Sequence, residues 1–159
     1  MQSQTQTPAH RITAAYRHRE STHRALNAPG EYAPRDAYAA ELAYRFSTLA
    51  PLSPPYGDTL DRETAYLIHE QTAYLLGLGL LAADFLASMP GLSLSVSKRA
   101  RSFRSLAEEA MTELIEYVES DDPRLGAQVK SALQPLKILI HDLHAVAAHL
   151  QCKALDVGP

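Results

Sequence analysis

Apolar residues recur three or four positions apart along most of this chain. Over residues 34–49, for example, Tyr38, Leu42, Phe46 and Leu49 follow this spacing, which places them on one face of an α-helix. No segment alternates apolar and polar residues as a β-strand does, and the sequence has no Asn-Gly or Asp-Gly hairpin turn. The pattern therefore predicts an all-α protein.

Five helices are expected, two shorter ones followed by three long ones. The first runs from Pro8 to about Leu26, because Thr7 can cap it and proline is tolerated in a first turn. Its apolar face is thin, so we expect it to dock only weakly. The other helices are expected over residues 34–49, from Asp58 or Asp61 to Ser88, over residues 95–120, and from Asp121-Asp122-Pro123 to about residue 150, with a kink at Pro135.

The third helix is apolar around most of its circumference, and such a helix must be surrounded by protein. Its polar positions Glu70 and Asp84 fall with Gly77 on one narrow stripe that repeats every seven residues. We expect Gly77 and Gly79 to permit close approach of neighbouring helices. Residues 73–89 contain Asp84 and fall short of the ~20 apolar residues that span a membrane. They therefore predict a buried core helix rather than a membrane segment.

The helices are expected to form one four-helix-like bundle over residues 8–155, between a polar tail at 1–7 and a short tail at 156–159. Composition agrees, because 46% of the 159 residues are hydrophobic and 21% are charged, as in folded globular domains. Cys152 is the only cysteine, and the start "MQSQTQTPAH" lacks the apolar run of a signal peptide. We therefore expect a cytoplasmic protein.

Charge is segregated along the chain, although the net charge is only −3. Residues 94–107 contain four basic residues and no acid, whereas residues 108–122 contain seven acids and no base. The fourth helix therefore has a basic start and an acidic end, which is unfavourable with respect to the helix dipole. Two copies of this helix packed antiparallel about a two-fold axis would pair these ends. Alternatively, arginines of the first helix could cover the acidic end.

These blocks predict a non-enzymatic interaction or regulatory protein that forms a homodimer and binds another protein. Its predicted basic surface consists of Arg17, Arg19, Lys98, Arg99, Arg101 and Arg104. Its predicted acidic surface consists of Glu109, Glu113, Glu116 and Glu119. We expect no cofactor and no metal. His141 and His144 have a spacing that can hold a metal, but His141 lies almost opposite the core stripe and His149 well to its side, and Glu20 and His23 form a single Glu-x-x-His pair.

A second interpretation is a DNA-binding regulator with a degenerate helix-turn-helix over residues 82–104. Ala87 and Gly91 keep the spacing of that motif, but Ser97 stands where an apolar residue is expected. The same stretch is also compatible with an ordinary junction, in which Gly91 ends one helix and Ser93, Ser95 or Ser97 caps the next. Nucleic acid remains a possible partner in this interpretation.

A third interpretation is enzymatic. HEPN ribonucleases are all-α dimers in which a catalytic Arg is followed at short spacing by His, and Arg62 and His69 are similar to that pattern. Two other pairs, Arg11 with His18 and Arg17 with His23, have comparable spacing. Glu63 directly follows Arg62 and would repel an RNA phosphate.

Overall fold

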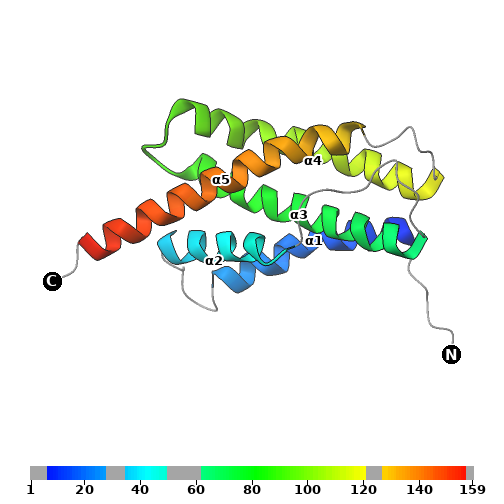
Figure 1. Ribbon diagram of the computed structural model, residues 1–159, viewed down its shortest axis with the longest axis horizontal. Coiled ribbons are helices and arrows are strands. Elements are labelled where there is room, and N and C mark those ends of the chain that lie inside the picture. Colours follow the sequence, from blue (N-terminus) through cyan, green and yellow to red (C-terminus); the bar gives the residue numbers. More distant parts are fainter. Residues whose placement is uncertain (1–6, 28–34, 50–61, 121–126, 157–159) are drawn as a thin grey trace.

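The computed structural model describes residues 7–27, 35–49, 62–120 and 127–156, without the side chains of residues 62–65 and 152–156. Within these ranges the protein forms five helices and no strand, which confirms the predicted all-α bundle (Figure 1). The helices are α1 (Pro8–Leu26), α2 (Arg35–Ser47), α3 (Arg62–Ser88), α4 (Leu94–Ser120) and α5 (Ala127–Asp156). The predicted helix start at Asp121-Asp122-Pro123 and most of both tails lie outside the described residues.

Local sequence signals determine most of the helix ends. The Thr7 hydroxyl accepts a hydrogen bond from the His10 backbone N–H (3.2 Å) and caps α1 as predicted. Ser93 accepts from the Val96 N–H (3.3 Å) at the start of α4. Gly91 lies between α3 and α4 with φ +82°, a conformation that favours glycine. These contacts confirm that the stretch is a junction between two helices.

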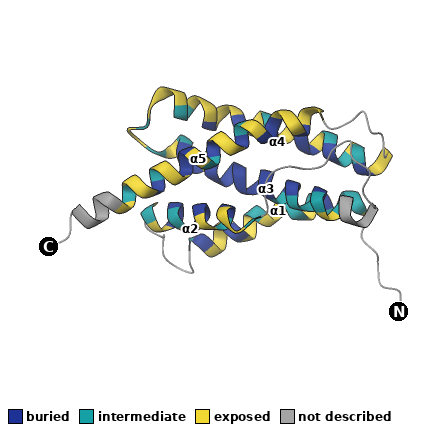
Figure 2. Cartoon of the chain, in the orientation of Figure 1, coloured by how far each residue is buried: buried dark blue, intermediate teal, exposed yellow. Residues whose placement is uncertain are grey.

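Helix α3 occupies the centre of the bundle. Every residue from 75 to 83 is buried (Figure 2), because α1, α4 and α5 all pack against this helix. One described segment, Tyr66–Ser88, is long and apolar enough to cross a membrane by length and composition, and 67% of its most apolar window is buried inside the protein. Its apolar surface is therefore largely used in the core.

The three long helices run up, down and up. Helices α3 and α4 are antiparallel, since Asp84 contacts Arg104 and His69 contacts Tyr117. Helix α5 is antiparallel to α4 and continues through Pro135 without interruption. Helix α2 packs mainly on α5 and covers one end of the bundle. This order confirms the predicted up-down arrangement.

Helix α1 lies parallel to α3 along the stripe that repeats every seven residues. Arg11 forms an ion pair with Glu70, and a Cβ placed on Gly77 would lie 2.5 Å from the Tyr16 carbonyl oxygen. Of all helix pairs in the described chain, α1 and α3 share the most extensive contact. The thin apolar face of α1 therefore does not limit its docking area, because a glycine and polar pairs complete the contact.

The other buried glycine of α3 faces α4 and α5. A Cβ on Gly79 would lie 2.7 Å from Leu136 Cδ1 and 2.8 Å from Phe103 Cε2, and the side chains of both residues are fully buried. Both glycines thus allow close helix approach, as the sequence predicts, but toward different neighbours.

Candidate functional site

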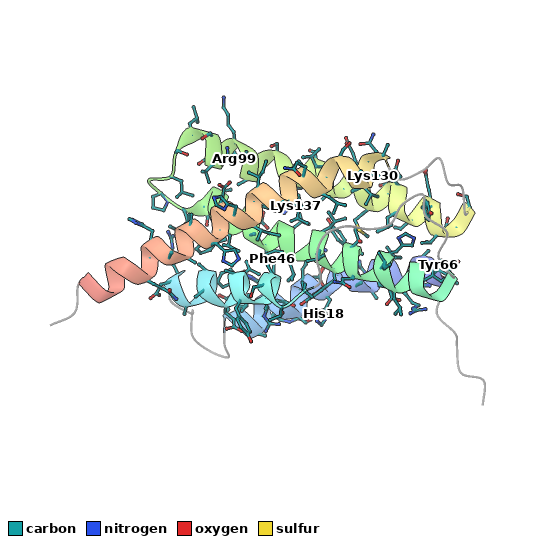
Figure 3. The ribbon with its side chains drawn as sticks, viewed as in Figure 1. His18, Phe46, Tyr66, Arg99, Lys130 and Lys137 are labelled. Atoms are coloured by element: carbon teal, nitrogen blue, oxygen red, sulfur yellow. The ribbon has the colours of Figure 1, made fainter. Side chains whose placement is uncertain are left out.

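The predicted basic surface is divided between side chains that are used within the fold and side chains that are free. Arg99, on α4, donates from Nε and Nη2 to the two carboxylate oxygens of Asp142 on α5, each at 3.1 Å (Figure 3). The Asp142 residue is only 8% exposed. Such a two-point contact fixes the geometry of both groups. Arg99 therefore joins α4 to α5.

Two further predicted basic residues also have partners within the chain. Arg104 donates to both carboxylate oxygens of Asp84 at 3.2 Å and lies 4.0 Å from the Glu108 carboxylate. The guanidinium of Arg19 lies 4.4 Å from the centre of the Tyr16 ring and donates to the Tyr16 carbonyl oxygen (3.0 Å). Both arginines therefore make contacts that stabilise the fold.

One predicted acidic residue has a structural role that the sequence did not indicate. The Glu113 carboxylate, on α4, accepts hydrogen bonds from the backbone N–H groups of Gln128 (2.7 Å) and Val129 (3.1 Å). These N–H groups lie in the first turn of α5, where the helix dipole favours negative charge. Glu113 therefore caps the neighbouring helix.

The side chains of six of the ten predicted residues make neither an ion pair nor a hydrogen bond to another residue within the part of the chain that the structure describes. Arg17 is exposed on α1, beside a shallow groove that His10 and Arg24 also line. The other five are exposed on the outer side of α4, which we call the bipolar face: Lys98, Arg101, Glu109, Glu116 and Glu119. At 1.5 Å per residue, about 22 Å separates Arg101 from Glu116. The bipolar face therefore has opposite charge at its two ends.

The junction between α3 and α4 does not have the geometry of a helix-turn-helix. That motif joins helices that cross at about 90–120°, whereas α3 and α4 lie antiparallel along their length. Moreover, two of the four basic residues within 94–107, Arg99 and Arg104, bind carboxylates. Of these four, only Lys98 and Arg101 have no ion-pair partner in the described structure.

His69, the residue of the ribonuclease interpretation, lies inside the bundle. It is 4% exposed, and its ring meets the edge of the Tyr117 ring with centroids 5.0 Å apart. Burial lowers the pKa of His69 below its usual value of 6.5. The side chain of Arg62 lies outside the described residues. The imidazole is thus enclosed by protein, away from the surface where a phosphate would approach.

Histidines do not gather with carboxylates in the described part of the chain, where no three His, Cys, Asp or Glu side chains are placed to hold a metal ion. His141 and His144 are both exposed on α5.

A cavity of about 500 Å³ lies where the end of α1, the start of α2 and the end of α3 meet. The rings of Tyr38 and Phe85 stack in its wall, with centroids 5.5 Å apart and planes inclined by 15°. His23 Nδ1 lies 2.8 Å from the Tyr38 hydroxyl, and Asn27 Nδ2 lies 3.0 Å from His23 Nε2. Burial, followed by the charge of Asp84, raises the pKa of Tyr38 to about 12.

No pattern in the sequence predicts this cavity. Helical periodicity places Tyr38 only on an apolar helix face, and Asp84 only on a polar stripe. Two signals were available, namely a carboxylate within a very apolar helix and the three-residue spacing of Arg35 and Tyr38 on one helix face. No known protein family, curated protein or solved structure matches the chain.

Proposed function

We propose that the protein is a non-enzymatic binding protein that self-associates through the bipolar face, with two α4 helices antiparallel about a two-fold axis. The observation that supports this proposal is the set of unpaired, opposite charges at the two ends of one exposed helix face. Within the described chain, neighbouring helices neutralise Arg99, Arg104 and Glu113 but leave this face unpaired.

The helix dipole makes this arrangement costly for an isolated chain. Cations near the start of a helix and anions near its end are each unfavourable by about 0.3–1 kcal/mol. A second α4 running in the opposite direction would place acid beside Lys98 and Arg101 and base beside Glu116 and Glu119. Association would therefore relieve an unfavourable charge distribution at both ends.

A single two-fold axis would pair the charges at both ends of the bipolar face. A two-fold axis that passes between positions 108 and 109 of α4 would place Lys98 opposite the partner's Glu119. The same axis would place Arg101 opposite the partner's Glu116. A self-complementary patch of this kind is what a two-fold dimer requires. Glu108 and Glu109 lie near the axis and repel their copies, although Arg104 lies near Glu108. Exposed ion pairs contribute about 0.2–1 kcal/mol each, so the dimer is expected to be weak and sensitive to salt.

A charge-swap experiment tests this proposal. The variant Lys98→Glu/Arg101→Glu has an acidic face at both ends, and Glu116→Lys/Glu119→Lys has a basic face at both ends. In sedimentation velocity at low salt, each variant alone should associate less than wild type, whereas an equimolar mixture should associate more strongly than either alone. Raising the salt concentration should dissociate the mixture, because exposed charges are screened.

Arg17→Glu is the matched control, since Arg17 is an exposed arginine on α1 away from the bipolar face. It should leave self-association unchanged. Wild-type protein that stays monomeric at millimolar concentration would contradict the proposal, and so would a mixture that associates no better than its components. In the proposed dimer Arg17 stays accessible, and α1 is available to a second protein.

A further inference from the structure

The cavity between α1, α2 and α3 has the size and composition of a small-molecule site. Its volume of about 500 Å³ lies within the range of roughly 300–1,000 Å³ that is typical of ligand pockets. Apolar side chains of α3, Leu81 and Phe85, form one wall, and Tyr38 adds a stacked ring. The polar groups come from the ends of three different helices. The cavity thus combines an apolar wall on α3 with polar side chains from the ends of all three helices.

Among the described residues that line the cavity, Arg35 at the start of α2 is the only one with a permanent positive charge. It is exposed and makes no ion pair in the described structure, where its guanidinium donates one weak hydrogen bond to Met89 Sδ (3.6 Å). Asp84, the lining carboxylate, already binds Arg104 through both oxygens. The cavity therefore retains one unpaired positive charge.

Tyr38 provides a second donor beside this charge. Because the Asn27 amide donates to His23 Nε2, the ring proton lies on Nδ1 and is donated to the Tyr38 oxygen. The hydrogen of the Tyr38 hydroxyl then needs another acceptor, and none is found among the described residues. Tyr38 is 7% exposed, so an unused donor at this place has a cost. Arg35 and Tyr38 lie three residues apart on one face of α2, where both can reach the same group.

We propose that this cavity binds a small aromatic monocarboxylate, with its carboxylate between Arg35 and the Tyr38 hydroxyl and its ring against Leu81 and Phe85. A guanidinium and a hydroxyl are charge-matched donors for a carboxylate. The stacked pair Tyr38–Phe85 offers an aromatic surface beside them. Because Arg35 is the one unpaired cation of the described lining, the cavity matches a ligand with a single negative charge.

Calorimetric titration with two probes of the same shape, 2-naphthoate and 2-naphthamide, tests this assignment. Wild-type protein should bind 2-naphthoate saturably and about tenfold more tightly than the neutral amide, the difference expected for one charge-assisted contact. Arg35→Gln should abolish this preference, because it removes the charge that distinguishes the carboxylate from the amide. Tyr38→Phe should weaken binding of both probes, because each has a carbonyl oxygen that accepts from the hydroxyl.

Two further variants complete the test. Lys130→Gln removes an exposed cation of α5 that lies outside the cavity lining (Figure 3) and should leave both affinities unchanged. Ser88→Trp, at the cavity wall, should prevent binding of both probes while the helical circular dichroism spectrum is retained. The proposal is wrong if neither probe binds saturably, if both bind wild type equally, or if Arg35→Gln keeps the preference for naphthoate. The outcome does not depend on self-association through α4.

Discussion

The inner and outer sides of α4 have the same kinds of charged residue but use them differently. Arg99 lies on the side of α4 that faces α5 and, although it is partly exposed, binds Asp142, whereas the neighbouring Lys98 has no ion-pair partner in the described structure. Likewise, Glu113 caps α5, while Glu116 is exposed and has no ion-pair partner among the described residues. One residue along a helix changes the direction of a side chain by about 100°. A block of charge in sequence is therefore not one surface in space.

The largest expected effect tests how closely the inner surfaces pack. Gly77→Val should lower the free energy of unfolding by about 3 kcal/mol, because its Cβ would meet the Tyr16 backbone oxygen and overpacking is costly. Thermal and urea denaturation measure this loss. Ser105→Val places the same side chain on the exposed side of α4 and should cost much less. Equal losses would show that α1 does not pack on α3 as described.

The next effect tests the pair between α4 and α5. Arg99→Met should cost about 2 kcal/mol, since it leaves the poorly solvated Asp142 carboxylate without its cation. Asp142→Asn should cost only about 1 kcal/mol, because Arg99 is partly exposed and can be hydrated. Urea denaturation of the two single variants and of the double variant measures both losses and their coupling. A larger loss of stability for Asp142→Asn than for Arg99→Met would contradict the conclusion that Asp142 is the more buried partner.

A smaller effect compares two acids of α4. Glu113→Gln should cost about 1 kcal/mol, because the charge that caps the start of α5 is lost while the side-chain shape is kept. Glu109→Gln, on the bipolar face, should not change the free energy of unfolding measurably. Hydrogen exchange of the Gln128 and Val129 amides should accelerate in the first variant alone. Unchanged exchange would argue against the cap.

The smallest effect is a change in pH dependence. The pKa of His69 is lowered by burial, so between this value and 6.5 the unfolded chain binds a proton that the folded protein does not. The free energy of unfolding should therefore fall as the pH falls through this window. In His69→Gln this contribution is absent, and the slope of stability against pH should be shallower. Identical slopes for both proteins, measured by urea denaturation, would contradict a depressed pKa.

Much of the fold could be predicted from sequence because the signals are local. Both ends of α1 and α4 and the C-terminal end of α3 agree with their predicted positions to within about one residue, because caps, prolines or Gly91 mark these ends of a clear helical period. Likewise, because α3 is apolar around most of its circumference, its position at the centre of the bundle could be predicted. Local signals of this kind do not depend on how the helices are arranged.

The contacts across helices could not be predicted in the same way. Whether Arg99 or Lys98 finds a carboxylate depends on the rotation of α4 against α5, which a charge pattern does not determine. The cavity depends on three helix ends, at His23, Arg35 and Asp84, that the chain brings together over more than sixty residues. No periodic signal connects such positions.

The contact between the parallel helices α1 and α3 has a consequence for synthesis on the ribosome. Arg11 precedes its partner Glu70 by 59 positions, so at roughly 5–20 residues per second α1 waits about 3–12 s for the helix that will cover it. A strongly apolar helix would be exposed to aggregation or chaperone capture during this delay. Helix α1 has few apolar and many hydrophilic side chains. This composition suits a segment that must remain soluble until α3, the helix against which it packs, has been synthesised.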